Sequence, residues 1–128
     1  MRFNKYNVSP KEKRTVDGIV FASKWESEAY GLLKLLLGKK KFTLQPTYEL
    51  QPSFKLEGKT IRAIKYVADF LIKTESEEYI IDTKGMETDV FKIKEKMFKH
   101  KFNKSIVKLK RKSQLVDFIN KLKDEDDL

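Results

Sequence analysis

Residues 66–85, YVADFLIKTESEEYIIDTKG, decide how the middle of the chain folds. The stretch joins two β-prone runs, which predict one long strand over residues 59–74 and a second over residues 77–85. Because side chains alternate along a strand, Asp69 lies on the opposite side of the first strand from an apolar face. That apolar face comprises Ile64, Tyr66, Ala68, Phe70 and Ile72.

The short connection between these strands fixes their expected register. If the turn centres on Glu75 and Ser76, Thr74 pairs with Glu77, and the same register sets Asp69 opposite Asp82. Opposed residues have Cβ atoms roughly 4.5–5.5 Å apart, where like charges are destabilising. Two carboxylates that close either raise a pKa or hold a cation.

Lys84 lies on the same face of the second strand as Asp82, because the two are separated by one residue. A protonated lysine is no metal ligand, but it can position a water molecule or neutralise a phosphate. The alternative is structural, namely a pair of surface acids on a half-exposed sheet with Lys84 as their neutralising partner. A charge inside the apolar run YVADFLI favours a functional site.

The first helix, expected from about Ser23 to Leu37, supplies a candidate third acid. SKWE fits a capping box with Ser23 as N-cap and Glu26 at the third helical position, which explains Glu26 structurally. Helical periodicity also places Glu26 on the flank of the buried arc, with Glu28 on the opposite flank as the second candidate. The buried arc is expected to contain Trp25, Ala29, Leu32, Leu33 and Leu36.

The remaining segments complete a mixed α+β fold, a mixed sheet flanked by helices. A hairpin is expected over residues 15–21 with its turn at Asp17-Gly18, and an edge strand over residues 42–54, which two prolines interrupt. Residues 88–102 read as a helix, 105–112 as a short strand that can run parallel to 77–85, and 113–125 as a last helix. We expect a flexible basic arm over 1–15, one domain over 16–123 and an acidic tail over 124–128.

Composition narrows the class of protein. The 128 residues carry a formal net charge of +9, which favours a polyanionic partner, most simply nucleic acid; the alternative is a basic protein without one. The chain has no cysteine and one histidine, His100, which argues against thiolate zinc sites and against nucleases that use several histidines. No apolar run is long enough to span a membrane and no secretory signal is visible, so we expect a cytoplasmic protein without a membrane partner.

Lysines gather in three places that could contact a phosphate backbone. The helix over 88–102 carries Lys92, Lys96 and Lys99 on one stripe and Lys94 and Lys101 on an adjacent one. Its inward residues are expected to be Val90, Ile93, Met97 and Phe98. The other two places are the arm and the cluster Lys39, Lys40 and Lys41. A charge run is also what any solvated helix face shows, and no base-reading motif is present, so backbone and shape recognition is expected.

Together SKWE, YVADF and IDTKG resemble the PD-(D/E)XK nuclease superfamily, in which a helix Glu, a strand Asp and an acid-x-Lys form one metal site. The order S-x-x-E, D-F and acid-x-K-G is similar to phage Holliday-junction resolvases of the endonuclease I type. Residues 15–112 also resemble a family of small phage and prophage endodeoxyribonucleases, once a domain of unknown function, with F-x-S-x-x-E, a repeated LQP and K-I-K-x-K-x-F. Ala68 stands where the superfamily motif has proline.

The resemblance implies a restriction-endonuclease-like core and Mg²⁺ or Mn²⁺ as the cofactor. It assigns Glu26, Asp69, Asp82 and the Thr83 carbonyl to the metal and makes Lys84 the catalytic lysine. It further implies cleavage of branched phage DNA by a homodimer, since resolving a junction takes two symmetric cuts. Open alternatives are a less selective endonuclease of the same fold, a non-catalytic DNA-binding protein that retains the fold, and an RNA target.

Overall fold

A four-stranded mixed sheet forms the centre of the protein in the computed structural model, which describes residues 9–125. Its strand order is β10-β9-β8-β3. β3 (Phe42–Leu44) and β8 (Phe70–Lys73) are antiparallel, as are β8 and β9 (Glu78–Asp82), whereas β10 (Ile106–Lys108) runs parallel to β9. The predicted mixed α+β class is confirmed, and β3 is an edge strand as expected.

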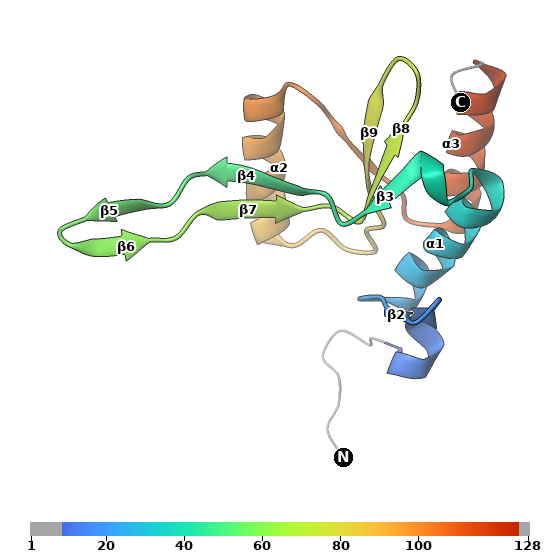
Figure 1. The fold of residues 1–128 in the computed structure, drawn as a ribbon, viewed down its shortest axis with the longest axis horizontal. Helices are drawn as coiled ribbons and strands as arrows, with labels where there is room; N and C mark the ends of the chain where they lie inside the picture. The colour runs from blue at the N-terminus through green and yellow to red at the C-terminus, as the bar shows by residue number, and fades with distance from the viewer. Residues whose placement is uncertain (1–8, 126–128) are drawn as a thin grey trace.

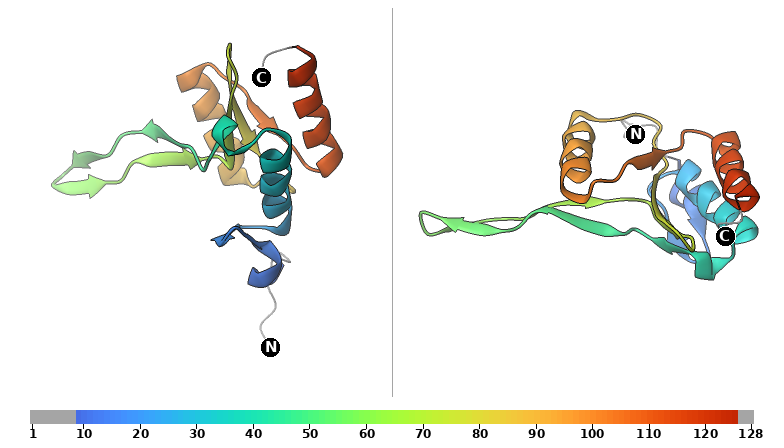
Figure 2. Two further views of the ribbon diagram at one scale, coloured as in Figure 1. Left: turned by 45° about the vertical axis from the view of Figure 1, so that its right-hand side comes forward. Right: turned by 90° about the horizontal axis from the view of Figure 1, so that it is seen from above.

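Helices cover both faces of this sheet (Figure 2). On one face, α1 (Lys24–Leu36) and α3 (Lys112–Asp124) pack through residues such as Leu33 and Ile119 against Phe70, Ile72 and Ile81. On the other face, α2 (Asp89–Phe102) packs through Phe91 and Phe98 against Ile80 and Ile106. Two apolar cores therefore lie back to back, separated by the sheet.

The segment β9–α2–β10 is the parallel crossover that the sequence predicts. The Thr88 hydroxyl caps α2 by accepting a hydrogen bond from the Phe91 backbone N–H, and Asn103 ends the helix in the left-handed conformation. The expected inward face of α2 is wrong at two positions, since Val90 and Ile93 are exposed. Phe91, Glu95 and Phe98 face inward instead, because the helix is rotated to pack its aromatic residues on the sheet.

The predicted long strand over residues 59–74 is in fact three strands, β6 (Lys59–Ile61), β7 (Ile64–Val67) and β8. The chain bends sharply between β7 and β8, at Ala68 and Asp69 (Figure 1). As a result Tyr66 and Ala68 join the core beneath α2, whereas Phe70 and Ile72 join the core beneath α1 and α3. The single apolar face expected for this stretch is therefore divided between both sides of the sheet.

The neighbouring strand bends at the same level, so the two strands form a common corner. Gln45, with φ of 48°, and Pro46 separate β3 from β4 (Thr47–Gln51). Two backbone hydrogen bonds join the bends, from Gln45 N to Asp69 O at 2.9 Å and from Ala68 N to Pro46 O at 3.0 Å. The break in β pairing that a proline imposes thus coincides with the place where Asp69 leaves the strand.

Beyond the corner the two strands continue away from the body as a twisted ribbon (Figure 1). β4 pairs with β7 next to α2, and β5 (Phe54–Leu56) then pairs with β6 at the far end. The turn between them is Glu57-Gly58, with φ values of 52° and 77°, the left-handed pair that a two-residue hairpin requires.

The N-terminal hairpin is present as predicted, with β1 (Thr15–Val16) and β2 (Ile19–Val20) joined at Asp17-Gly18. Within the expected arm, residues 11–15 form a 3₁₀-helix η1 (Lys11–Arg14) and the start of β1. Residues 1–8 of the arm, with Arg2 and Lys5, lie outside the described residues, as do residues 126–128 of the acidic tail. Within residues 9–125, no helix has the length and apolar character needed to cross a membrane.

Candidate active site

Asp82 ends strand β9 and is 1% exposed. Its carbonyl accepts a hydrogen bond from Leu109 N at 2.8 Å, and its carboxylate oxygen Oδ2 accepts one from the hydroxyl of Tyr66. Burial raises the pKa of Asp82 to about 7, and the charge of Asp69 adds to this, although the Tyr66 hydrogen bond and Lys84 act in the opposite direction. An acid this deep in the fold and with so little compensation is unusual for a merely structural residue.

Asp69 lies at the corner, one position beyond the paired residues Phe70 and Ile81. The predicted register is confirmed, because Thr74 N also bonds to Glu77 O at 2.9 Å and Asp69 N to Ile81 O at 3.1 Å. The Asp69 carboxylate accepts two hydrogen bonds from Thr83, from its backbone N–H at 2.8 Å and from its hydroxyl at 2.7 Å. These bonds fix Asp69 beside Asp82, where its charge raises the pKa of its neighbour.

Glu26 reaches the same place from the first turn of α1. Ser23 caps this helix as predicted, accepting a hydrogen bond from Glu26 N at 3.0 Å, while the Trp25 indole donates to Leu109 O at 2.9 Å and ties α1 to the end of β10. Glu26 is 3% exposed. Its pKa is raised to about 7, first by burial and then by the charge of Asp69.

The structure separates the two candidate third acids. The Glu28 side chain is 51% exposed and lies 3.9 Å from Lys24 on the helix surface. Glu26 has Asp69 and Asp82 among the groups that shift its pKa. The acid cluster, as we call Glu26, Asp69 and Asp82, therefore draws one residue from α1, one from the corner and one from β9.

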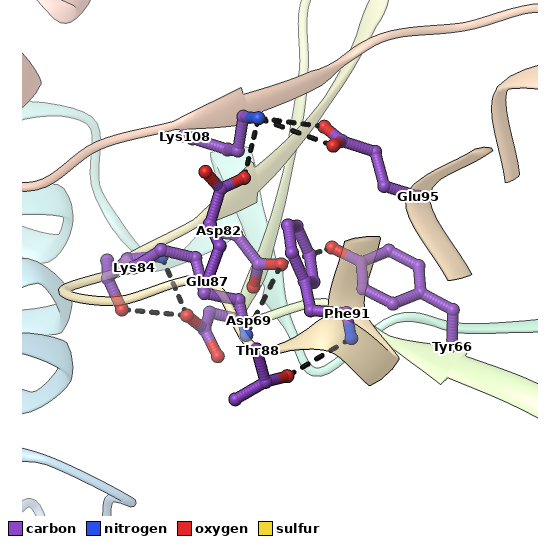
Figure 3. A network of polar contacts seen from close by, with 10 residues as sticks. Tyr66, Asp69, Asp82, Lys84, Glu87, Thr88, Phe91, Glu95 and Lys108 are labelled. Atoms are coloured by element: carbon purple, nitrogen blue, oxygen red, sulfur yellow. Dashed lines mark hydrogen bonds and ion pairs between the residues drawn. The ribbon is translucent and has the colours of Figure 1, made fainter. Parts of the chain in front are cut away.

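Lys84 stands at the edge of the acid cluster, in the loop that leads to α2. Its Nζ lies 4.0 Å from Asp82 Oδ2 and 4.5 Å from the centre of the Phe91 ring (Figure 3). The two contacts hold the ammonium group between a carboxylate and an aromatic face, and about a third of the side chain, 31%, remains exposed. Lys84 can thus touch both the buried acids and a molecule arriving from solvent.

The acid cluster has the donor chemistry of a hard divalent cation, namely several carboxylate oxygens in one buried place with too little positive charge nearby. The raised pKa values of Glu26 and Asp82 express the same deficit. Among residues 9–125, however, no three acidic, histidine or cysteine side chains are already set out as a finished coordination group. The residues fit such a cation in kind, and their side chains would adjust to ligate it.

A second ionic cluster lies nearby, around Lys108, whose Nζ is 6.0 Å from the centre of the Phe91 ring (Figure 3). Lys108 Nζ lies 2.8 Å from an oxygen of Glu87 and 3.0 Å from an oxygen of Glu95. The hydrogen bond from Lys108 lowers the pKa of Glu87, and the bonds to both acids raise the pKa of Lys108. We call these three residues the compensated cluster, because its charges are paired within the chain.

A surface groove runs between β7 and the start of α2 and includes Lys84. It is lined by Lys65, Tyr66, Val67, Lys84, Thr88, Val90, Phe91 and Lys94. Three of its lining residues are basic, so the groove offers a cationic approach to the site from solvent. We refer to it as the Lys84 groove.

The predicted nucleic-acid-binding lysines fall in different places. Lys94 lines the Lys84 groove, Lys92 and Lys96 are exposed on α2, and Lys99 is 3.8 Å from Glu95. The cluster Lys39, Lys40 and Lys41 forms a 3₁₀-helix η2 (Lys39–Lys41) after the last turn of α1. Because Glu26 is in the first turn, those three lysines lie about 15 Å further along the helix and are not brought to the acid cluster.

Sequence reasoning missed Tyr66 and Phe91 as parts of the site. Tyr66 was expected only as one of several apolar residues on a strand face, and Phe91 was absent from the expected inward face of α2. A buried tyrosine needs a partner for its hydroxyl, which was the one available signal that Tyr66 would meet a polar group.

Comparison with known proteins gives one match. A family model described as "Protein of unknown function (DUF1064)" matches residues 3–117. No curated protein and no solved structure matches the chain.

Proposed function

The chain belongs to the DUF1064 family, and we propose that it is a divalent-metal-dependent DNA endonuclease. One observation carries the proposal, the convergence of Glu26, Asp69 and Asp82 from three separate parts of the fold into one largely buried cluster beside Lys84. Three adjacent carboxylates, of which those of Glu26 and Asp82 are buried, repel one another unless protons or a cation intervene. A chain that keeps this arrangement gains from it only if something binds there.

Glu26, Asp69 and Asp82 would hold Mg²⁺ or Mn²⁺, and the Thr83 carbonyl would add a further donor. When bound, such an ion lowers the pKa of a water molecule and neutralises charge on the phosphate. Tyr66 holds the Asp82 carboxylate in place, and Thr83 does the same for Asp69. In the hydrolysis, the water oxygen forms a bond to phosphorus while the bond to one deoxyribose oxygen breaks.

Lys84 supplies the chain's own positive charge at the reacting phosphate. Its ammonium group is held by Asp82 and the Phe91 ring, so little reorganisation is needed for it to donate a hydrogen bond to a phosphate oxygen or to the attacking water. Hydrogen-bond donors that are fixed in advance stabilise developing charge more effectively than mobile ones.

The substrate class follows from charge. The formal net charge of +9 and the basic lining of the Lys84 groove suit a polyanion that passes directly over the site. Preference for branched DNA, action as a homodimer and work in the cytoplasm are part of the proposal, and they rest on the resemblance to junction-resolving endonucleases. Light scattering of the purified protein measures the oligomeric state.

The test is cleavage of labelled four-way junction, linear duplex and single-stranded DNA, each with Mg²⁺, with Mn²⁺ and with EDTA. We expect cleavage with either metal and none with EDTA. Glu26→Gln should abolish cleavage, whereas its matched control Glu28→Gln should cleave like the wild type, because the Glu28 side chain faces solvent. If the protein binds DNA but cleaves none of these substrates with either metal, it is a non-catalytic DNA-binding protein and the proposal is wrong.

A further inference from the structure

The outer half of the ribbon beyond the corner, unlike the half formed by β4 and β7, has no packing partner among residues 9–125. Residues 52–62 are all exposed, and β5 and β6 pair with each other at the end away from the body (Figures 1 and 2). A two-stranded hairpin alone is at best marginally stable in water. We call strands β5 and β6 with their turn, residues 54–61, the outer ribbon.

One face of the outer ribbon is mainly apolar. Directly paired residues share a face, so Phe54 lies beside Ile61, and two positions on Leu56 lies beside Lys59. Phe54 is 43% exposed and Leu56 is 56% exposed, so neither contributes its full apolar area to any core. Side chains of this kind, placed where they stabilise nothing in the isolated chain, indicate a surface that is covered when a partner binds.

Charge identifies the kind of partner. Between residues 54 and 65 stand Lys55, Lys59, Arg62 and Lys65 against the single acid Glu57. In the described part of the chain these four basic side chains form no ion pair with it or with any other acid. Two copies of such a ribbon packed on each other would bring like charges together, whereas a phosphate backbone would neutralise them.

The ribbon is also continuous with the approach to the active site. Lys65 and Val67 of β7 line the Lys84 groove, and the same strand hairpin continues from there to the turn at Glu57. From Lys65 to Glu57 the strands span about 26 Å, at roughly 3.3 Å per residue. This is the length of about eight base pairs at 3.4 Å each.

We infer that the outer ribbon is a second contact surface for double-helical DNA, which lies along the ribbon in a groove of the duplex while the backbone passes Lys84. A two-stranded ribbon fits the major groove of B-form DNA. Phe54 and Leu56 face the bases or sugars. Lys59 from the same face, and Lys55 and Arg62 with long side chains that extend around the edges of the ribbon, contact phosphates on the groove walls. The inference rests on the proposed function for its substrate.

Anisotropy of a labelled duplex in EDTA tests this without hydrolysis, on a duplex of about 15 base pairs or more so that it can span groove and ribbon. The triple variant Lys55→Ala/Lys59→Ala/Arg62→Ala should weaken binding about tenfold and reduce the slope of log K against log salt by about 2.7. The matched control Lys112→Ala/Lys121→Ala/Lys123→Ala removes the same charge from α3, where all three are exposed, and should change the affinity less than about twofold.

A second variant replaces residues 52–63 with Asn-Gly, which closes the hairpin directly after the paired residues Gln51 and Ile64. It should bind duplex as weakly as the triple variant while retaining cleavage at saturating enzyme. If the wild type cleaves but both ribbon variants bind duplex like it, the ribbon inference is wrong and the nuclease proposal stands. A wild type that neither binds nor cleaves would overturn the proposed function itself.

The competing occupant, a second copy of the chain, has its own signature. If the shortened variant turns a dimer into a monomer while the triple variant keeps wild-type affinity for duplex, the ribbon is a dimer contact and the inference is overturned. Light scattering of the wild type and both variants gives this result.

Discussion

Two ionic clusters lie side by side at the ends of two parallel strands. In one the acidic side chains are paired with a lysine, and in the other three carboxylates lie close to one another. Asp82 ends β9, Lys108 ends β10, and the two residues are register partners. Lys108 is bound by Glu87 and Glu95, whose charges it offsets. Asp82 instead faces two further acids, and among residues 9–125 the ion pair recorded for these three carboxylates is with Lys84, at 4.0 Å.

The contrast separates structural charge from functional charge. In the compensated cluster the pKa of each shifted group moves so as to keep it ionised, downward for Glu87 and upward for Lys108. In the acid cluster the pKa values of Glu26 and Asp82 move so as to remove the charge. An acid whose surroundings disfavour its ionised form lowers the stability of the folded protein when it is ionised. Such groups gather at functional sites.

The largest expected effect comes from Asp82→Asn. We expect a loss of cleavage of roughly 1,000-fold or more, because a metal ligand is removed and metal stabilisation is worth several kcal/mol. The free energy of unfolding without metal should stay the same or rise, since one of three repelling charges disappears. Single-turnover cleavage and urea unfolding in EDTA measure the two quantities.

Lys108→Met is the matched change in the compensated cluster and should behave in the opposite way. It leaves the buried Glu95 with only the more distant Lys99, at 3.8 Å, among the described residues, so the free energy of unfolding should fall by about 1–3 kcal/mol. Cleavage by the folded fraction should stay within about threefold of wild type. If Asp82→Asn destabilises the protein as much as Lys108→Met does, the two clusters are both structural.

The next largest effect is expected for Lys84→Ala. Removing this ammonium group should slow cleavage by about 100- to 1,000-fold, the usual cost of losing one fixed donor at the transition state. Duplex affinity should change less than about twofold, because many other lysines supply the basic field. If the variant loses duplex affinity and cleavage to the same extent, Lys84 only contacts a phosphate and has no role in the transition state.

Tyr66→Phe should have a smaller effect of the same kind. The ring stays in the aromatic cluster with Phe91 and Phe98, but the donor to Asp82 is lost. Because partners of metal ligands orient them, we expect a loss of about tenfold in Mn²⁺ affinity, read by calorimetric titration, and a similar loss in cleavage at limiting metal. Unchanged metal affinity would show that the hydroxyl does not position Asp82.

The smallest effect is on thermal stability as a function of pH. The folded-state pKa values of Glu26 and Asp82 lie near 7, above their ordinary values of 4.5 and 3.8, so the folded state binds more protons in between. Their contribution to stability is therefore full below about pH 4 and is lost as pH rises to about 7. In EDTA, melting temperature should fall by a few degrees over this range, and Asp82→Asn should flatten the fall.

Divalent metal completes that measurement. Above pH 7 the acids are ionised, and Mg²⁺ or Mn²⁺ should raise the melting temperature of the wild type because it binds the folded state. The same ions should leave the melting temperature of Asp82→Asn nearly unchanged. If metal leaves the melting temperature of the wild type unchanged at every pH, there is no metal site in the acid cluster.

Much of the hairpin that carries Asp69 and Asp82 was predictable, because its register depends on one short turn and on the alternation of side chains. The turn at Glu75 and Ser76 and the pairing that follows from it are found in the structure. The helix N-cap at Ser23 was predictable for the same reason, since the short segment from Ser23 to Glu26 determines it. The bend at Ala68 was not, because YVADFLI reads locally as one continuous strand.

The sequence by itself determined the start of α1 at Ser23, the register of β8 and β9 and the excess of basic charge. Only the tertiary structure decided that Glu26 rather than Glu28 joins the acids, that Tyr66 donates to Asp82, and that Lys108 is held by two acids. These outcomes depend on how α1 and α2 are rotated against the sheet. That rotation is set by the packing of side chains far apart in the chain, such as Leu33 on Phe70 and Phe98 on Tyr66, and no local pattern encodes it.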